Sequence, residues 1–399
     1  MPRQRRTSLS PTCTSDFALA GLYVHVPFCT RRCVYCDFYV TTTGRDTAGF
    51  ARAAAVEIEA VGREFGAREP LATLYIGGGT PSLLSPGDLA VILSAVRRHF
   101  TLAPQAEVTF EANPEDVTAS LVGAWRDLGV TRVSLGVQSF FDEDLAFMTR
   151  NHDGTGAEEA IEHIAKAFDS FSVDLIFGVP EQPFEHWGAN LERAVRLGAP
   201  HVSAYSLTVE DHTPLQNQVA RGVVIPADDE TMRERFLFTH EFLEARGLEH
   251  YEVSSFARPG HHSHHNSLYW SHGNVLAVGP SAHAFWRETR SRAWRWANVA
   301  HLGRWRGLLE AGHMPVDARE RLGADDLADE AVLLGLRRLD TGLDLDRLEA
   351  DYGVDLLGEK AATLAALEGA GLLTVTPSRV RLTPDGAAIA DAVAVRLTG

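Results

Sequence analysis

Three of the four cysteines in the chain lie close together, and their spacing indicates an iron–sulfur site. Cys29, Cys33 and Cys36 form the pattern C-x3-C-x2-C within the stretch YVHVPFCTRRCVYCDFY. A cubane iron–sulfur cluster takes one ligand for each iron, and thiolates are its usual ligands. Three cysteines therefore ligate three irons and leave the fourth iron open to another molecule.

Two other uses of these cysteines are weaker interpretations. A structural zinc site needs four ligands and commonly uses two C-x-x-C pairs. This chain has no second pair, and His25 is the only histidine nearby. A disulfide framework is typical of short, cysteine-rich secreted chains. The spacing therefore favours a cluster whose metal ligands are Cys29, Cys33 and Cys36.

Further candidate binding residues stand where expected strands end. The run Gly77 to Thr80 lets a charged group approach main-chain atoms, although a tight strand-to-helix turn explains these glycines nearly as well. Glu111, Gln138 and Asp174 end three successive strands, so they meet at one edge of a parallel sheet. Arg150 can pair with a carboxylate, but a solvated surface arginine is the simpler interpretation of that residue alone.

A second candidate site is the histidine-rich and aromatic stretch HHSHHNSLYW, from His261 to Trp270. Neutral histidine is a common axial ligand of heme iron, and flanking aromatic side chains can stack on a porphyrin. A histidine cluster in a loop is otherwise solvated surface or a weak metal site. The residues by themselves leave both interpretations open.

The cysteine pattern, preceded by Tyr-x-His-x-Pro-Phe, resembles the radical S-adenosylmethionine (SAM) superfamily. Within it, the chain is similar to the anaerobic coproporphyrinogen oxidase group and the related heme chaperones, from Tyr23 to near the C-terminus. The resemblance implies a [4Fe-4S] cluster whose open iron chelates the amino and carboxylate groups of SAM and can cleave it to a 5′-deoxyadenosyl radical. It also implies SAM-binding roles for Tyr23, Tyr35, Gly78, Gly79, Thr80, Glu111, Gln138, Arg150 and Asp174.

Two functions are compatible with this resemblance, and three features distinguish them. The oxidases usually carry one more cysteine two residues after the third, where this chain has Phe38. They also carry an extended, tyrosine-bearing segment before the cysteine strand, whereas residues 1–20 here contain no tyrosine. The third feature is a His-Asn-x-x-Tyr-Trp motif that resembles the heme-binding motif of the chaperone branch, with His265, Tyr269 and Trp270 as candidate heme contacts.

We therefore expect a heme chaperone that binds heme or a related tetrapyrrole and passes it to an acceptor protein. The second function is an oxygen-independent coproporphyrinogen III oxidase, which converts two propionates to vinyl groups. A downstream motif, Gly-Pro-Ser-Ala-His, also resembles the chaperone branch and makes His283 a second candidate iron ligand. Both cleavage and simple binding of SAM are compatible with the pattern, so enzymatic activity stays open.

The elements that must position these residues alternate between strands and helices. This alternation predicts a parallel βα architecture. Six such units fall short of the eight that close a barrel, so the expected fold class is α/β, a partial (β/α)6 barrel, which the resemblance also implies. The six expected strands are Leu22 to Val26, Ala72 to Ile76, Ala106 to Glu111, Arg132 to Val137, Ser172 to Phe177 and His201 to Leu207.

Beyond residue 325 helical patterns dominate and two short β runs follow, at 373–376 and 379–383, which predicts a winged-helix-like domain. Residues 341–399 hold nine Asp and Glu against five Lys and Arg, so a duplex-binding role is disfavoured. The expected division is a disordered tail (1–20), a radical SAM partial barrel (21–215), a connecting region with the His- and Trp-rich motif (216–320) and the C-terminal domain (321–399).

The composition of the chain limits the classes of partner it can bind and the compartment in which it is expected. The net charge of −16 and the pI near 5.5 disfavour nucleic acid and anionic lipid as partners. No run approaches the ~18 apolar residues of a membrane span, so we expect at most a peripheral membrane contact. With few cysteines and no recognisable export signal, the cytoplasm is the expected location, and it suits an oxygen-labile cluster. Cys13 is interpreted as a bystander.

Overall fold

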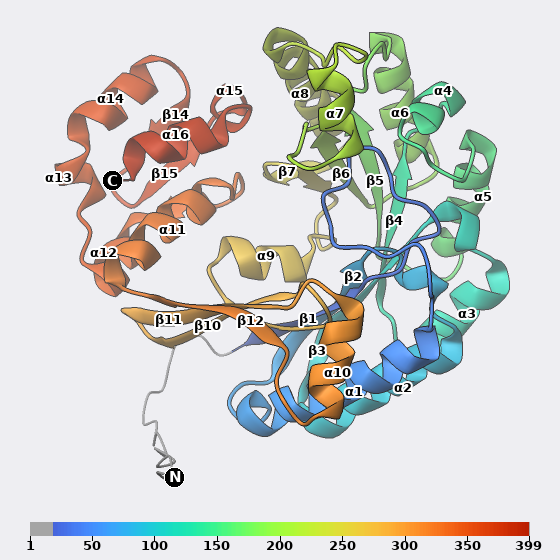
Figure 1. Cartoon of the computed structure of the whole chain (residues 1–399). Coiled ribbons are helices and arrows are strands. Elements are labelled where there is room, and N and C mark those ends of the chain that lie inside the picture. The colour runs from blue at the N-terminus through green and yellow to red at the C-terminus, as the bar shows by residue number, and fades with distance from the viewer. Residues whose placement is uncertain (1–18, 399) are drawn as a thin grey trace, which may run out of the picture.

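The computed structural model of the protein describes residues 19–398 (Figure 1). The expected disordered tail therefore lies outside the described residues except for Leu19 and Ala20, and Cys13 lies outside them as well.

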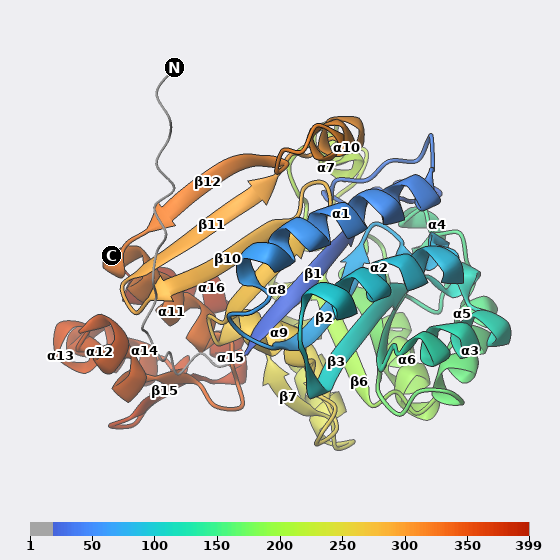
Figure 2. The same cartoon turned by 90° about the horizontal axis from the view of Figure 1, so that it is seen from below.

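Six parallel strands form the centre of the molecule and confirm the expected α/β partial barrel. They are hydrogen-bonded in chain order, each parallel to the next. The strands are β1 (Ala20–Val26), β2 (Leu71–Gly78), β3 (Leu102–Ala112), β4 (Arg132–Gln138), β5 (Phe171–Phe177) and β6 (His201–Ser206). Helices run along the outer side of this curved sheet (Figure 2). They are α1 (Thr47–Phe65), α2 (Pro86–His99), α3 (Ala119–Leu128), α5 (Gly154–Ala165) and α6 (Phe184–Arg196).

The outer face of the sheet holds the apolar core. Leu22 and Val24 of β1 are fully buried in one cluster with Phe50 and Ile58 of α1. Residues two apart on a strand point to the same face, and residues at helical spacing on α1 face them. Each such side chain contributes about 1.5–3 kcal/mol when it is buried. The apolar spacing in α1 thus fixes the helix against the cysteine-bearing strand.

The inner face of the sheet is polar, which the sequence pattern did not indicate. Side chains paired in register lie on the same face of neighbouring strands. One such row joins Tyr23, Tyr75, Thr109 and Arg132 across β1 to β4. A second row, one step toward the carboxyl ends, joins Glu111, Ser134, Ser172 and His201 across β3 to β6. The lumen of the barrel is therefore lined by hydroxyl, carboxyl and imidazole groups.

Residues of the expected connecting region extend the sheet at both edges. On the β1 edge, β9 runs parallel to β1, and three antiparallel strands follow; on the β6 edge, two antiparallel strands are added. The added strands are β7 (Glu249–Glu252), β8 (Ser255–Ala257), β9 (Asn274–Val278), β10 (His283–Thr289), β11 (Arg292–Asn298) and β12 (Val316–Leu322). Helices α7 (Pro214–Ala220), α8 (Asp229–Glu244) and α10 (Leu302–Glu310) complete this region.

A buried carboxyl group ties the β1-edge extension to the barrel. Glu57 of α1 is fully buried and accepts hydrogen bonds from the Gly279 amide (2.9 Å), Asn298 Nδ2 (2.6 Å) and Trp305 Nε1 (2.8 Å). Burial raises the pKa of Glu57 to about 7, although these three donors favour the ionised form. One side chain thus holds the loop after β9, the end of β11 and helix α10 against α1.

The C-terminal domain has its own sheet and its own core. Its three strands pair in the order β13-β15-β14, and its buried residues form a separate cluster against which Phe236 of α8 and Val253 also pack. The elements are α11 (Ala324–Leu336), β13 (Leu343–Asp344), α12 (Leu345–Tyr352), α13 (Leu356–Glu359), α14 (Ala361–Gly369), β14 (Leu373–Val375), β15 (Arg379–Leu382), α15 (Pro384–Ala387) and α16 (Ala390–Leu397). The expected helices and hairpin are thus present, with α15 and α16 in addition.

The short helix α9 (His264–Trp270) carries the candidate heme motif and lies between the barrel and the C-terminal domain (Figure 1). It contacts β1, β2 and β9 on one side and α11 on the other. A Cβ added to Gly21 of β1 would lie 3.0 Å from the Leu268 side chain and 3.2 Å from His265, so α9 packs directly on the inner face of the sheet. Among the described residues, no helix is long and apolar enough to span a membrane.

Candidate functional site

The loop that carries the three cysteines leaves the carboxyl end of β1 and closes back on it. The Cys29 amide donates to the Thr41 carbonyl oxygen (3.1 Å), and the Thr41 amide donates to the Pro27 carbonyl oxygen (2.6 Å). A tight turn inside the loop is closed by the Cys36 amide and the Cys33 carbonyl oxygen (3.3 Å). All three thiols are free and partly exposed, and they line one cavity of about 460 Å³.

Two of the three sulfur atoms accept a hydrogen bond from the cavity wall. Thr80 Oγ1 donates to Cys29 Sγ (3.4 Å), and Arg150 Nη1 donates to Cys33 Sγ (3.6 Å). Burial raises the pKa of Cys29, and it raises the pKa of Cys36 to about 11. Without a cation these two groups therefore stay protonated, whereas bound iron favours the thiolate.

The donor set fits a cluster better than a single ion. Nowhere in residues 19–398 do three His, Cys, Asp or Glu side chains come together closely enough to bind one metal ion. A cubane cluster needs no such convergence, because each thiolate ligates a different iron.

The glycine-rich turn after β2 is packed against the cysteine strand. Gly78 has a φ of +113°, and a Cβ there would lie 2.7 Å from His25 Nδ1. A Cβ on Gly79 would lie 2.6 Å from the Phe28 carbonyl oxygen and 3.1 Å from Cys29 Sγ. Both positions therefore require glycine for close packing, and the turn also presents its backbone to the cavity.

Two carboxyl groups enter the cavity from β3 and β5. Glu111 accepts hydrogen bonds from the Tyr75 hydroxyl (2.7 Å) and the Gly78 amide (3.0 Å), and burial raises its pKa to about 7. Asp174 accepts from the hydroxyls of Ser134 and Ser172, both at 2.8 Å. The cavity thus offers two acceptors that a ligand with amino or hydroxyl groups could use.

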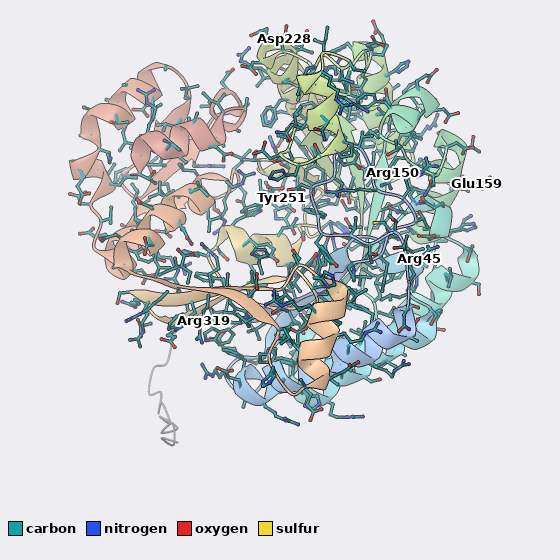
Figure 3. All side chains as sticks on the ribbon, viewed as in Figure 1. Arg45, Arg150, Glu159, Asp228, Tyr251 and Arg319 are labelled. Atoms are coloured by element: carbon teal, nitrogen blue, oxygen red, sulfur yellow. The ribbon has the colours of Figure 1, made fainter. Side chains whose placement is uncertain are left out.

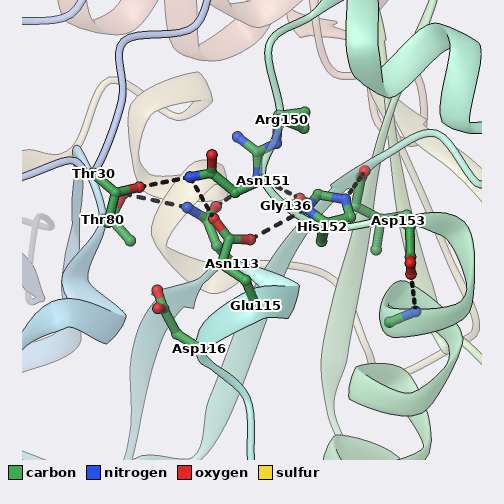
Figure 4. A network of polar contacts seen from close by, with 12 residues as sticks. Thr30, Thr80, Asn113, Glu115, Asp116, Gly136, Arg150, Asn151, His152 and Asp153 are labelled. Carbon is green, nitrogen blue, oxygen red and sulfur yellow. Dashed lines mark hydrogen bonds and ion pairs between the residues drawn. The ribbon is translucent and has the colours of Figure 1, made fainter.

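Gln138 is the last residue of β4, and Arg150, in the loop before α5, reaches back to the same strand. Arg150 Nη2 donates to Asn113 Oδ1 and to the Gly136 carbonyl oxygen, each at 2.7 Å (Figure 4). Its position is therefore built by the site and is not that of a solvated surface arginine. Gln138 follows an irregularity in the β4–β5 pairing and has a φ of +67°, a conformation that non-glycine residues adopt mostly where the surroundings impose it.

The structure adds several residues to the site that sequence reasoning missed. Asn113 Nδ2 donates to Thr80 Oγ1 (3.3 Å) while its Oδ1 accepts from Arg150. Next to this group, His152 Nδ1 lies 3.2 Å from Glu115 Oε2, and its Nε2 lies 2.9 Å from the Val137 carbonyl oxygen (Figure 4). The available signal was position, since Asn113 and Glu115 directly follow the same strand end as Glu111.

Most of the predicted SAM-binding residues line the same cavity as the cysteines, although their contact with a ligand stays a prediction. The residues that line it are Tyr35, Gly78, Gly79, Thr80, Glu111, Gln138, Arg150 and Asp174. Tyr23 is not among them: its hydroxyl lies 3.1 Å from His25 Nδ1, deeper in the barrel.

The candidate heme residues do not line this cavity either, although the His265 ring lies 5.0 Å from that of Tyr75, which does. His265 is 1% exposed, with Nδ1 at 2.7 Å from Thr73 Oγ1 and Nε2 at 3.1 Å from the Tyr269 hydroxyl. Burial lowers the pKa of His265 to about 3, so its imidazole is neutral. Trp270 points to the C-terminal domain, where its ring lies 4.9 Å from the guanidinium of Arg337. The second candidate ligand, His283, is exposed on β10.

Two family models match the chain. The model of the radical SAM superfamily matches residues 23–194, and the model of the HemN C-terminal domain matches residues 322–389. Together with the partial barrel and the C-x3-C-x2-C loop, they define a radical SAM protein. Membership in this superfamily implies a [4Fe-4S] cluster and SAM as cofactors.

Similar proteins with known names show which family within the superfamily the chain belongs to. The chain is 40% identical over 384 residues to the heme chaperone HemW of Mycobacterium tuberculosis, which covers 95% of both chains. It is 31% identical to the heme chaperone HemW of Bacillus subtilis, over 94% of this chain and 98% of the relative. It is also 34% identical to a mitochondrial radical S-adenosyl methionine domain-containing protein 1 of Bos taurus, over 95% and 87% of the two chains. The chain belongs to the HemW family of radical SAM proteins.

A solved structure supports the fold. The radical SAM enzyme HemN of Escherichia coli, a coproporphyrinogen III oxidase, superimposes with a TM-score of 0.79 over 96% of this chain and 90% of that chain, at 22% identity. At this identity the similarity concerns the fold, including the C-terminal domain.

Proposed function

We propose that this protein is a heme chaperone that binds heme and transfers it to an acceptor protein, with a cluster and SAM as its resident cofactors. The observation that carries the proposal is the 40% identity, over 95% of both chains, to a relative named as a heme chaperone. The cysteine cavity and the motif on α9 are the structural features that support it. A reducing compartment suits the oxygen-labile cluster of such a protein.

The cavity provides suitable groups for each part of the cofactor pair. Cys29, Cys33 and Cys36 would each ligate one iron, and the bound cluster would supply an open iron for the amino and carboxylate groups of SAM. Gly78, Gly79 and Thr80 border the same space, where main-chain groups can approach the methionyl end of the ligand.

The remaining cavity residues would hold the rest of SAM. Glu111 and Asp174 would accept hydrogen bonds from its amino and ribose hydroxyl groups. The Gln138 amide would both donate to and accept from its adenine. Arg150 would attract its carboxylate. Tyr35 lines the cavity beside them. Tyr23 does not line the cavity, so it would act indirectly, through its hydrogen bond with His25.

Heme would bind at α9, whose residues His265, Tyr269 and Trp270 match the chaperone motif. Tyr269 is 37% exposed and accessible, whereas His265 is 1% exposed. A neutral imidazole is the form that ligates iron. His265 can therefore reach heme iron only when α9 moves away from the inner face of the sheet.

The oxidase function is the second candidate. Phe38, which stands where the oxidases usually have a further cysteine, is 57% exposed at the cavity. A phenylalanine cannot ligate iron or move a proton, so this position supports the chaperone.

Two anaerobic samples of reconstituted protein test the proposal. One receives hemin, and the other receives reductant, SAM and coproporphyrinogen III. Stoichiometric hemin binding, without formation of protoporphyrinogen IX in the second sample, is the expected result. Decarboxylation in the second sample at a catalytic rate would instead establish the oxidase.

A further inference from the structure

A continuous line of hydrogen bonds runs through the barrel from the cavity wall to Ser263, the residue just before the heme-motif helix α9. Asp174 Oδ1 accepts from Ser172 Oγ (2.8 Å), and Ser172 Oγ lies 2.8 Å from His201 Nδ1. His201 Nε2 lies 2.8 Å from the Tyr251 hydroxyl, which accepts from the Ser263 amide (3.2 Å). Every link falls within ordinary hydrogen-bond distance.

The two ends of this line fix the direction of every bond in it. The Ser263 amide can only donate, and Ser172 gives its single proton to the Asp174 carboxylate. Ser172 must then accept from His201, so the proton of the neutral imidazole lies on Nδ1. His201 Nε2 consequently accepts from the Tyr251 hydroxyl. Burial lowers the pKa of His201 well below its usual range, which agrees with a single ring proton.

The line joins the two candidate sites, because one end lies at the SAM cavity and the other at the start of the helix that carries the heme motif. Asp174 lines the cavity that holds the cysteines. Ser263 is the N-cap of α9: its hydroxyl accepts from the Asn266 amide (3.3 Å), and its carbonyl oxygen accepts from the Ser267 amide (3.1 Å). A shift of Ser263 therefore shifts the start of the helix that carries His265.

Tyr251 is the residue where three parts of the molecule meet. Its side chain joins the barrel to α9, and its ring stacks on His262 with centroids 4.0 Å apart. Its carbonyl oxygen accepts from the Leu339 and Asp340 amides of the C-terminal domain (3.0 and 3.3 Å). Figure 3 shows Tyr251 between the barrel and that domain. A displacement of Tyr251 therefore alters contacts both with the start of α9 and with the C-terminal domain.

We propose that Ser172, His201 and Tyr251 are positioning residues that couple occupancy of the SAM cavity to the release of α9. The proposal deepens the proposed function and rests on it for the identity of the ligand. A ligand that donates to Asp174 competes with the Ser172 hydroxyl for the carboxylate. Ser172 then turns away from His201, and the Tyr251 hydroxyl beyond His201 shifts. Its contact with the Ser263 amide weakens, so α9 opens more readily and exposes His265.

Hydrogen exchange of α9 tests the coupling without any heme. Anaerobically reconstituted protein is exchanged with and without saturating SAM, and the deuterium uptake of peptides that cover residues 263–271 is followed by mass spectrometry. In the unmodified protein, SAM should speed exchange about fivefold, the low end of common coupling strengths. SAM binding is measured separately by titration, and hemin binding by a second titration.

Two substitutions cut the line at points far apart. Tyr251→Phe removes the acceptor of the Ser263 amide but keeps the ring on His262, so α9 should exchange quickly whether or not SAM is bound. Ser172→Ala removes the donor to Asp174 and the acceptor of His201, so the contact of Tyr251 with Ser263 should be weakened whether or not SAM is bound, and the response to SAM should again be lost. Loss of the response at both points is what a line of coupling predicts, and a local effect at α9 does not predict it.

Two control variants match these substitutions. The Tyr39 hydroxyl accepts from the Leu302 amide at the start of α10 (2.7 Å), so Tyr39→Phe makes the same atomic change at another helix. The Ser203 hydroxyl lies 3.0 Å from Ser172 Oγ but outside the line, so Ser203→Ala is the control for Ser172→Ala. Both controls should keep the fivefold response.

The coupling is overturned if bound SAM leaves α9 exchange unchanged in the unmodified protein, or if Tyr251→Phe and Ser172→Ala respond as fully as the controls. A failure of the heme function would appear elsewhere, as the absence of hemin binding in the separate titration. The two failures are therefore distinguishable.

Discussion

Thr80 donates a hydrogen bond to the sulfur of Cys29 over 3.4 Å, which joins the glycine-rich turn after β2 to the first cysteine after β1. Thr80 Oγ1 also accepts from Asn113 Nδ2 of the next strand end. Three successive strand ends thus hold one thiol in place. This contact explains why two motifs that are about 50 residues apart in sequence act as one site, as the carboxyl ends of parallel strands allow.

Replacing any one of Cys29, Cys33 or Cys36 by serine should abolish the brown absorbance of the cluster after anaerobic reconstitution. Serine lacks the thiolate that iron prefers, and two thiolates cannot hold a cubane. The absorbance spectrum and the iron content measure the effect. Cys13→Ser is the control and should keep both. Unchanged spectra in all three variants would contradict the assignment of the ligands.

SAM affinity should rise with pH around neutrality if Glu111 accepts a hydrogen bond from the ligand. Burial raises the pKa of Glu111 to about 7, so at pH 6 about one tenth of the molecules carry the ionised form. Affinity should therefore increase up to about tenfold between pH 6 and pH 8 and level off above. Titration of the reconstituted protein at several pH values measures this.

Two variants test whether that pH dependence belongs to Glu111. Glu111→Gln should bind SAM more weakly and with a flat pH profile. Tyr75→Phe removes the hydroxyl that favours the ionised carboxyl, so the midpoint should move to higher pH. A profile of Glu111→Gln that rises as steeply as that of the unmodified protein would assign the titration to another group.

The free energy of unfolding should fall as the pH rises from about 4.5 to about 7, partly because of Glu57. The folded-state pKa of Glu57 is about 7 against an ordinary value of 4.5, so the folded protein binds this proton more tightly than the unfolded chain does. The stabilisation is full below pH 4.5 and is lost as the pH rises through 7, with a total of about 3 kcal/mol.

Urea unfolding of the cluster-free protein at pH 5 and pH 8 measures this loss. Glu57→Gln cannot ionise, so the difference between the two pH values should shrink by about 2.5 kcal/mol. Glu59→Gln, on the exposed side of the same helix, should leave the difference as it is. Equal pH dependence in both variants would show that Glu57 does not titrate in this range.

His265→Ala should weaken hemin binding, since His265 is the ligand that the motif on α9 predicts. The expected loss is about tenfold or more, although the cost of opening α9 already lowers the apparent affinity of the unmodified protein. Titration followed by the heme absorbance measures it. His264→Ala, an exposed neighbour on α9, is the matched control. If His283→Ala weakens binding instead and His265→Ala does not, the iron ligand lies on β10.

The central strands could be predicted from the sequence because their apolar runs and turn residues are local signals. All six expected strands are present. The edge strands were missed, since the Trp- and Arg-rich runs of β10 and β11 do not alternate cleanly between apolar and polar residues. Their pairing depends on contacts such as those of Glu57, which are remote in sequence.

The site was predictable to a similar extent. Cysteine spacing and strand-end positions pointed to one cavity, because topology alone brings strand ends together. The place of α9 was not predictable, because it depends on Gly21 leaving room for Leu268 and on Thr73 contacting His265. The line from Asp174 to Ser263 was hidden for the same reason: its members come from β5, β6, β7 and the start of α9.

Everything proposed for this cavity depends on an open iron that SAM can reach. The most direct measurement uses reduced, anaerobically reconstituted protein with SAM labelled by ¹⁵N at its amino group, observed by electron–nuclear double resonance. We predict a hyperfine coupling between the unpaired electron of the cluster and the labelled nitrogen, which disappears with unlabelled SAM. A sample in which SAM is bound by titration, but in which no such coupling is found, would contradict the open iron.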